Sequence, residues 1–352
     1  MARHTAKSHK IRKVEILVIQ IRIGEIVQNV NLEQERKSLV EQLDSYIKNH
    51  YEELIEKFAE CFKKYCNKIR MMQQAGKKEK IAYIHFSVLR TNILLKKHEI
   101  RIDAFDENWY MDPIECSYSY PVNEIYTYLE KYSNVVEELW KQSTDLNDFS
   151  DVYRKVFLES NIYLFYVAEI IRQGMRKLIE TEEYKSVAKA ECFVVCIGGY
   201  MDKFDILYKE DYTKKDSAVV RRRLQSGKQK IFSYEIFEKL DLSKGDYRDL
   251  EFQYSSFDNS NLSNSDMTKC RFIICNFKSA ILKDVRMDKA KIFGTDFSGA
   301  LLQNVDFSGA KLKSIIFKNA KLINVDFSKA LLAEDMNFEN AKCENCIFPE
   351  SR

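Results

Sequence analysis

Bulky apolar residues recur at every fifth position through the C-terminal third of the chain. The series starts at Leu242 and runs without a slip to Leu332; after an apparent one-residue insertion at Asp335 it resumes as far as Phe348. Two positions before each bulky residue there is usually a small or β-branched one, such as Ala290. Helices repeat near 3.6 residues and strands repeat at 2, so neither explains this pattern. The period predicts a chain that turns a corner every five residues, with four corners closing a coil of about 20 residues and the coils stacking as a solenoid.

The repeat is clearest in residues 295–299 (TDFSG), 300–304 (ALLQN) and 305–309 (VDFSG). This stretch resembles the pentapeptide-repeat family, whose members form a right-handed quadrilateral β-helix. The resemblance implies about five coils over residues 240–348. It implies a fold and no particular activity, because the family's roles are scattered and a fold does not determine function.

Residues 20 apart stack vertically in such a solenoid, so each column can be interpreted separately. One column contains Asn264, Asp284, Asn304, Asn324 and Asn345. Asn tolerates corner geometry and can bond its neighbour along the ladder, so this column is interpreted as structural.

Four cysteines of the repeat occupy positions that point inward. They are Cys270, Cys275, Cys343 and Cys346. The last two form a CxxC, but no second CxxC completes a four-cysteine zinc site, so all four are expected in the core.

One outer face carries basic and apolar residues at positions that should face solvent. The predicted interaction patch consists of Arg271, Ile273, Ile274, Lys291, Phe293 and Lys311. Stacked like charges repel, and large exposed apolar groups mark contacts. The basic column is interpreted first as a solvated face, with an acidic partner as the alternative. For the apolar residues beside it, the first interpretation is that the helical domain docks on this side, and the second is a separate protein partner.

The N-terminal part has a helical pattern. A long helix is expected at 33–72, with further helices at 79–96, 122–141, 151–180 and 192–208; a short strand at 19–23 could pair with 99–103. The predicted plan is a basic arm with a short strand at 1–30, a mainly helical domain at 31–212, a basic connector and solenoid cap at 213–239, and the solenoid. The long helix is expected to be a domain backbone or a dimer surface.

Charge is unevenly distributed. The net charge is +3, yet residues 240–352 hold 16 acidic and 16 basic side chains, so the excess lies in the N-terminal part. The arm at 1–13 is basic, and so is 213–230, which contains Arg221, Arg222 and Arg223. These segments are either solvated or possible contacts to nucleic acid phosphates.

Several classes of protein are disfavoured by what the sequence lacks. No P-loop, GxGxxG, HExxH or GxSxG motif is present, and His50, His85 and His98 have no metal-ligand spacing. No catalytic residue, metal site or cofactor is therefore predicted. An odd number of cysteines, nine, indicates reduced thiols in the cytoplasm. Neither a secretory signal nor a membrane span fits the first 30 residues.

These observations favour a non-enzymatic protein–protein interaction platform, with the solenoid as a rigid scaffold and the helical domain as a partner-binding or dimerising module. Three alternatives remain open. The chain could associate with nucleic acid through its basic segments, or contain an enzyme with dispersed residues in the helical domain. It could also protect a topoisomerase (gyrase) by imitating DNA, as some family members do. DNA imitation would need on the order of 15 excess negative charges, which this neutral solenoid lacks, and a C-terminal dimerising helix, which is not expected after Phe348.

Overall fold

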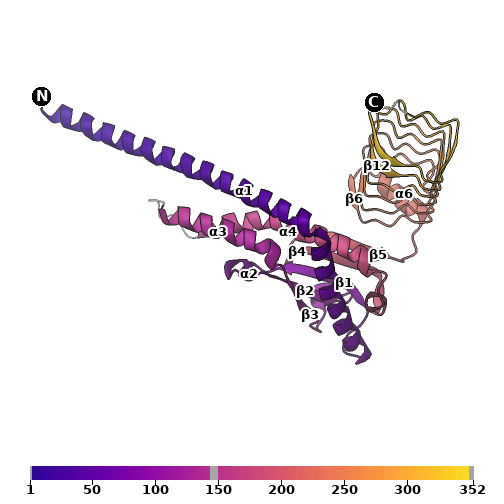
Figure 1. Cartoon of the computed structure of the whole chain (residues 1–352), viewed down its shortest axis with the longest axis horizontal. Coiled ribbons are helices and arrows are strands. Elements are labelled where there is room, and N and C mark those ends of the chain that lie inside the picture. The colour runs from indigo at the N-terminus through magenta and orange to yellow at the C-terminus, as the bar shows by residue number, and fades with distance from the viewer. Residues whose placement is uncertain (1, 143–149, 349–352) are drawn as a thin grey trace. The chain divides into compact units, whose positions relative to one another are not determined.

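The computed structural model describes the backbone of residues 2–142 and 150–348, and side chains from residue 32 onward within those ranges, apart from 142, 150, 151 and 332. The chain divides into two compact units (Figure 1). The first, here the N-terminal unit, comprises residues up to Ala190 and 195–207. The second, here the solenoid unit, comprises 191–194 and the residues from Tyr208 onward.

One long helix, α1 (Ala2–Gln74), forms the first element. It includes residues 19–23, so the predicted strand there is wrong; an alternation over five residues is too short to outweigh continuation of a helix. The helix kinks at His50 (φ −119°), whose Nδ1 lies 2.9 Å from the Tyr46 carbonyl oxygen. A side chain that competes for a helical carbonyl is a known cause of kinks. The helix ends before Gly76, which has a left-handed φ of +65°.

The helices predicted at 122–141 and 151–180 are present as α3 (Asn123–Gln142) and α4 (Ser150–Leu178), and both pack against α1. Their apolar faces supply buried residues such as Ile125 and Ile171. The helices α1 and α4 approach closely at Gly174, where an added Cβ would lie 2.2 Å from Phe58 Cδ1. Only glycine therefore permits this crossing without repacking.

The predictions missed a five-stranded sheet in the N-terminal part. Its order is β3-β2-β1-β4-β5. The strands are β1 (Ile81–Val88), β2 (Glu99–Phe105), β3 (Ser117–Pro121), β4 (Lys189–Gly199) and β5 (Phe204–Asp211). Short helical turns are α2 (Arg90–Leu94), η1 (Trp109–Met111) and α5 (Glu182–Lys185). The helices predicted at 79–96 and 192–208 are thus wrong, because strands buried on both faces have a continuous apolar run that does not differ in period from a buried helix. The strand predicted at 99–103 is present, and it pairs with β1 and β3.

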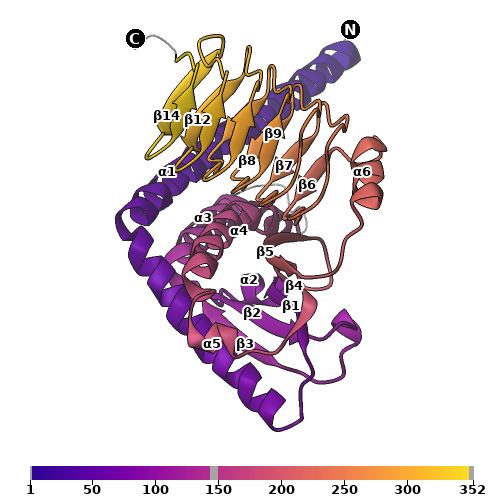
Figure 2. The same ribbon diagram turned by 90° about the vertical axis from the view of Figure 1, so that its right-hand side faces the viewer.

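The C-terminal third is the predicted β-helix, a β-solenoid of about six turns. One face is a parallel six-stranded sheet of β6 (Ile231–Ser233), β7 (Glu251–Gln253), β8 (Arg271–Ile273), β10 (Lys291–Phe293), β12 (Lys311–Ile316) and β14 (Leu332–Asn337). Another face is a four-stranded sheet of β9 (Ile281–Lys283), β11 (Leu301–Gln303), β13 (Lys321–Ile323) and β15 (Lys342–Glu344). Figure 2 shows these strands stacked in succession. The expected five coils become six because Ile231 already pairs with Glu251, so the first coil begins ahead of residue 240.

The one-residue insertion lies earlier than predicted. Asp306 pairs with Asp326, 20 residues on, whereas Lys311 pairs with Leu332, 21 residues on. The extra residue therefore lies between Asp326 and Leu332, not at Asp335. The spacing of the flanking phenylalanines allows any position in this stretch, so only the strand pairing locates it.

The solenoid core is a set of stacked rings. Phe277, Phe297 and Phe317 are fully buried, and successive ring centroids lie 4.8 and 5.4 Å apart with nearly parallel planes. Cys270 and Cys275 are buried among them, as predicted.

The prediction for the last coil's cysteines is wrong, because Cys343 is exposed and Cys346 is only half-buried. In the described part of the chain, no further coil stacks on this one. Its inward positions are therefore covered from one side only.

Candidate functional site

The six residues of the predicted interaction patch lie together on one face of the solenoid. Adjacent strands β8, β10 and β12 pair in parallel register, which places Arg271, Lys291 and Lys311 in one row. Ile273 and Phe293 form the next row on the same face. Their grouping follows directly from the 20-residue coil.

The basic row of the patch is largely unpaired. Arg271 binds the Glu251 carboxylate at 2.9 Å, but neither Lys291 nor Lys311 forms an ion pair with any residue that the structure describes. Another face differs: Arg286 lies 3.2 Å from Asp266 and 3.3 Å from Asp288. The patch therefore presents positive charge that the solenoid itself does not neutralise.

The apolar members of the patch are half-buried, not fully exposed as predicted. Ile274 sits at a corner with φ +53°, a conformation that is unfavourable for a β-branched residue. At the equivalent corner on another face, Asn304 and Asn324 have the same left-handed backbone and join in an amide ladder, with Asn324 Nδ2 donating to Asn304 Oδ1 at 2.9 Å. Nothing in the corner geometry requires isoleucine at 274, and strained positions of this kind concentrate at functional sites.

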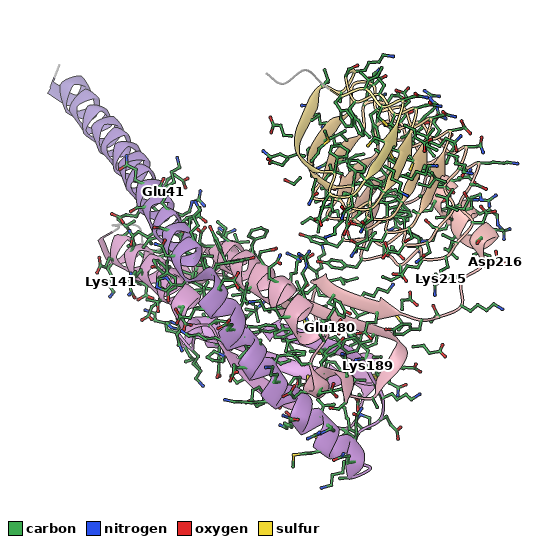
Figure 3. All side chains as sticks on the ribbon, turned by 45° about the vertical axis from the view of Figure 1, so that its right-hand side comes forward. Glu41, Lys141, Glu180, Lys189, Lys215 and Asp216 are labelled. Carbon is green, nitrogen blue, oxygen red and sulfur yellow. The ribbon has the colours of Figure 1, made fainter. Side chains whose placement is uncertain are left out.

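The three arginines predicted for nucleic acid contact lie on a short helix, α6 (Ser217–Gln225), which covers the first coil. Figure 3 labels Lys215 and Asp216 where the chain enters this helix, and the Asp216 carboxylate caps it by accepting from Ala218 and Val219 N–H. Val220 and Leu224 are buried in the solenoid core. Within the segment 213–239, which was predicted to be connector and cap, this helix covers the first coil, whereas Ile231–Ser233 already pairs with β7 as a strand of that coil.

Two of these arginines are engaged with the first coil. Arg221 donates to the Asp241 carbonyl at 2.8 Å, and Arg223 pairs with the Glu235 carboxylate. Arg222 donates only a long bond, 3.4 Å, to the Ala218 carbonyl. The cluster therefore offers fewer free guanidinium groups than its sequence indicates. The side chains of the basic arm at 1–13 lie outside the described residues.

A buried histidine lies on the sheet of the N-terminal unit. His85 is fully buried; its Nδ1 is 2.7 Å from the Tyr110 hydroxyl and 3.3 Å from Ser87 Oγ. Burial lowers the pKa of His85 to about 4, so the imidazole is neutral at pH 7. No described residue bonds its Nε2. A neutral, enclosed imidazole fits a structural role better than acid–base chemistry at the surface.

A second surface, which the sequence interpretation missed, surrounds this histidine. It is formed by two segments, 105–112 (FDENWYMD) and 200–205 (YMDKFD), each made of a loop and the adjoining end of a strand, β2 in the first and β5 in the second; it is termed the aromatic two-loop surface. Tyr110 joins them, because its hydroxyl accepts a hydrogen bond from Met201 N–H at 3.1 Å. The similar composition of the two loops was the available signal, but they are about 90 residues apart and only the sheet brings them together.

Four of the cysteine thiols are poor nucleophiles because they are buried. Burial raises the pKa of Cys196, Cys270 and Cys275 to about 12 and that of Cys61 to about 11. Among the residues that the structure describes, no group of three His, Cys, Asp or Glu side chains is placed to hold a metal ion. No helix in the described ranges is long and apolar enough to cross a membrane.

A groove of about 890 Å³ lies beside α1 in the N-terminal unit, bordered by β3 and the end of α4. Its charges are mixed, and some of them are paired: Lys57 lies 3.0 Å from Glu53 and 2.8 Å from Glu124. The arrangement shows no nucleophile next to a base.

Comparisons with known proteins agree with the fold. Residues 250–335 match the model of the family described as the pentapeptide repeat region, and no family model matches the N-terminal part. The C-terminal third is therefore a pentapeptide-repeat region. No curated protein matches the chain.

Solved structures resemble the chain only in part. HetL from the cyanobacterium Nostoc, a pentapeptide repeat protein involved in heterocyst differentiation regulation, is 18% identical over 34% of this chain and 47% of its own, with a TM-score of 0.22. The chain thus spans about half of HetL. A pentapeptide repeat protein from the Arabidopsis thaliana thylakoid lumen is 18% identical over 31% of this chain and 73% of its own, with a TM-score of 0.23. The plasmid-mediated fluoroquinolone resistance protein QnrB1 is 16% identical over 33% of this chain and 70% of its own, with a TM-score of 0.17. Likenesses this low carry no inference about function.

Proposed function

We propose that this protein is a non-enzymatic interaction platform whose solenoid captures a protein partner on the patch formed by Arg271, Ile273, Ile274, Lys291, Phe293 and Lys311. The observation that carries the proposal is the pair of unneutralised lysines, Lys291 and Lys311, next to half-exposed apolar side chains on a rigid parallel sheet. The matching partner surface is acidic around an apolar centre.

The coil architecture supports this role. Each strand pairs with the strands before and after it, so the outer side chains keep fixed spacing along the rod. A preorganised surface loses little conformational freedom on binding, which favours affinity. The free cysteines support our further proposal that the protein resides in the cytoplasm.

The test compares partner capture by full-length wild type and a Phe293→Asp variant at low and high salt. Gln303→Asp is the matched control, since Gln303 is also half-buried and follows an inward residue on the opposite sheet. We expect Phe293→Asp to abolish capture and Gln303→Asp to retain it, with both proteins folded by circular dichroism. Equal capture by all three proteins would contradict the proposal.

The basic row is tested separately. A double reversal, Lys291→Glu with Lys311→Glu, should weaken capture most strongly at low salt, because long-range attraction is screened as salt rises. Lys321→Glu on the opposite sheet should have little effect on capture. Retained capture by the double variant would assign binding to the apolar groups alone.

A further inference from the structure

The aromatic two-loop surface has features of a binding site of its own, distinct from the solenoid. Trp109 is at its centre: ring centroids lie 3.9 Å away for Tyr83, 5.2 Å for Tyr110 and 5.4 Å for Phe204. Tyr200 extends the cluster, 5.7 Å from Tyr110. Most of these pairs are edge-to-face or tilted, an arrangement that directs rings to different sides of the cluster.

The outer rings remain open to solvent although the cluster is well packed. Tyr200 is 46% exposed and Phe204 is 45% exposed, with Met201 at 66% and Met111 at 83% beside them. Contiguous exposure of large apolar groups is typical of contact surfaces. Trp109 and Met201 also have left-handed φ values of +57° and +56°. Neither is a residue that adopts this conformation readily, and such strain concentrates at functional positions.

The charges around the rings are predominantly negative. Glu107 and Asp205 are exposed and form no ion pair with any described residue, and Asp106 lies next to Glu107. The loops contain a single cation, Lys203. Asp202 is 3.7 Å from Arg90, a pair in which both side chains remain mostly exposed. Aromatic faces attract cations through the ring quadrupole, and carboxylates at the rim add to that attraction.

From this combination we propose that the aromatic two-loop surface binds a basic peptide segment of a partner, placing an arginine or lysine side chain against Tyr200 and Phe204. Glu107 and Asp205 pair with the peptide's flanking cations. The chemistry is opposite to that of the solenoid patch, which is basic. The two surfaces therefore select different partners, and the inference does not depend on the proposed function of the solenoid.

The chain provides its own reporter. It has two tryptophans, Trp109 and Trp140, so a Trp140→Phe variant leaves Trp109 as the sole indole. Full-length Trp140→Phe protein is titrated with a blocked peptide in which arginine alternates with glycine, and with its glutamine counterpart. We expect a saturable change of Trp109 emission with the arginine peptide and at least tenfold weaker binding of the glutamine peptide.

Substitutions then locate the contact. Tyr200→Ala and Phe204→Ala, each in the Trp140→Phe background, should weaken arginine-peptide binding at least fivefold. Phe165→Ala on α4 is the matched control, because that ring is 63% exposed and outside the surface, and its binding should match the parent. Glu107→Gln with Asp205→Asn should weaken binding and flatten its salt dependence.

Three results would overturn the proposal: no saturable response at millimolar peptide, equal affinity for the arginine and glutamine peptides, or unchanged affinity in both aromatic variants. Circular dichroism of each variant confirms folding. Capture of the solenoid's partner serves as an independent readout that Phe204→Ala should leave intact.

Discussion

Each of the two units is stabilised by its own internal contacts, and these contacts span very different separations along the sequence. In the solenoid unit, each backbone bond between coils joins residues about 20 apart, as when Lys291 N–H donates to the Cys270 carbonyl. In the N-terminal unit, the Tyr166 hydroxyl donates to Asp44 Oδ1 across 122 residues, and Gln73 bonds the Ala188 carbonyl across 115. The comparison shows why the solenoid fold can be predicted from a short sequence period, whereas the sheet of the N-terminal unit cannot. A repeat contacts its neighbours, whereas a mixed sheet depends on partners from distant parts of the chain.

The largest effect is expected for a break in the ring stack. Phe297→Ala removes a fully buried ring between Phe277 and Phe317 and should lower the free energy of unfolding of the solenoid by about 3–5 kcal/mol. Phe348→Ala is the control, because that ring is 43% exposed, and it should cost far less. Urea denaturation, with hydrogen exchange of the coils as the readout, measures the loss of unfolding free energy in both variants. Similar losses for the two variants would contradict the nearest-neighbour description.

Lowering the pH should reduce the free energy of unfolding of the N-terminal unit through protonation of His85. The pKa of His85 is about 4 in the folded chain and 6.5 when unfolded, so between these values the unfolded state binds more protons. The stabilisation is complete above pH 6.5 and is lost as pH falls toward 4, in total about 3 kcal/mol at about 1.4 kcal/mol per pKa unit.

The measurement for His85 is chemical denaturation at pH 7 and pH 4.5. A His85→Gln variant cannot titrate, so its pH dependence should be smaller than that of wild type, while other groups titrate equally in both. Identical pH dependence would show that His85 protonates freely in the folded protein.

Opening the cap should loosen the solenoid from its first coil. Leu224→Ala truncates a residue of α6 that is buried in the solenoid core, and should cost about 2–3 kcal/mol, with the largest rise in hydrogen exchange at β6 and β7. Val219→Ala on the same helix is 54% exposed and serves as the control. A uniform rise over all coils would indicate that the solenoid unfolds as one cooperative block.

The smallest effect is a reciprocal exchange of corner residues. Ile274→Asn relieves a left-handed isoleucine and should raise solenoid stability by about 1 kcal/mol, while weakening capture of the partner. Asn304→Ile should do the reverse for stability, because it adds the same strain and breaks the bond from Asn304 Nδ2 to Asp284 Oδ1 (2.7 Å). Thermal melts and the capture assay together check both; a less stable Ile274→Asn variant would refute the assignment of strain.

The sequence alone determined most features of the solenoid. These are its period, its inward-facing rings, its corner asparagines and the composition of one outer face. This was possible because each coil contacts only the coils directly before and after it, so the contacts join residues about 20 positions apart. The long helix and both α3 and α4 were likewise predictable, since a helix closes its hydrogen bonds within itself.

Tertiary structure alone decided the rest. The buried strands β1 and β4 have apolar runs that fit helix and strand equally, and only pairing with distant partners makes them strands. The same distant pairing brings residues 105–112 to 200–205, and so creates the aromatic two-loop surface. The first coil's cap and the place of the insertion between Asp326 and Leu332 also follow from stacking, because several registers satisfy the sequence period and the pairing between coils selects one.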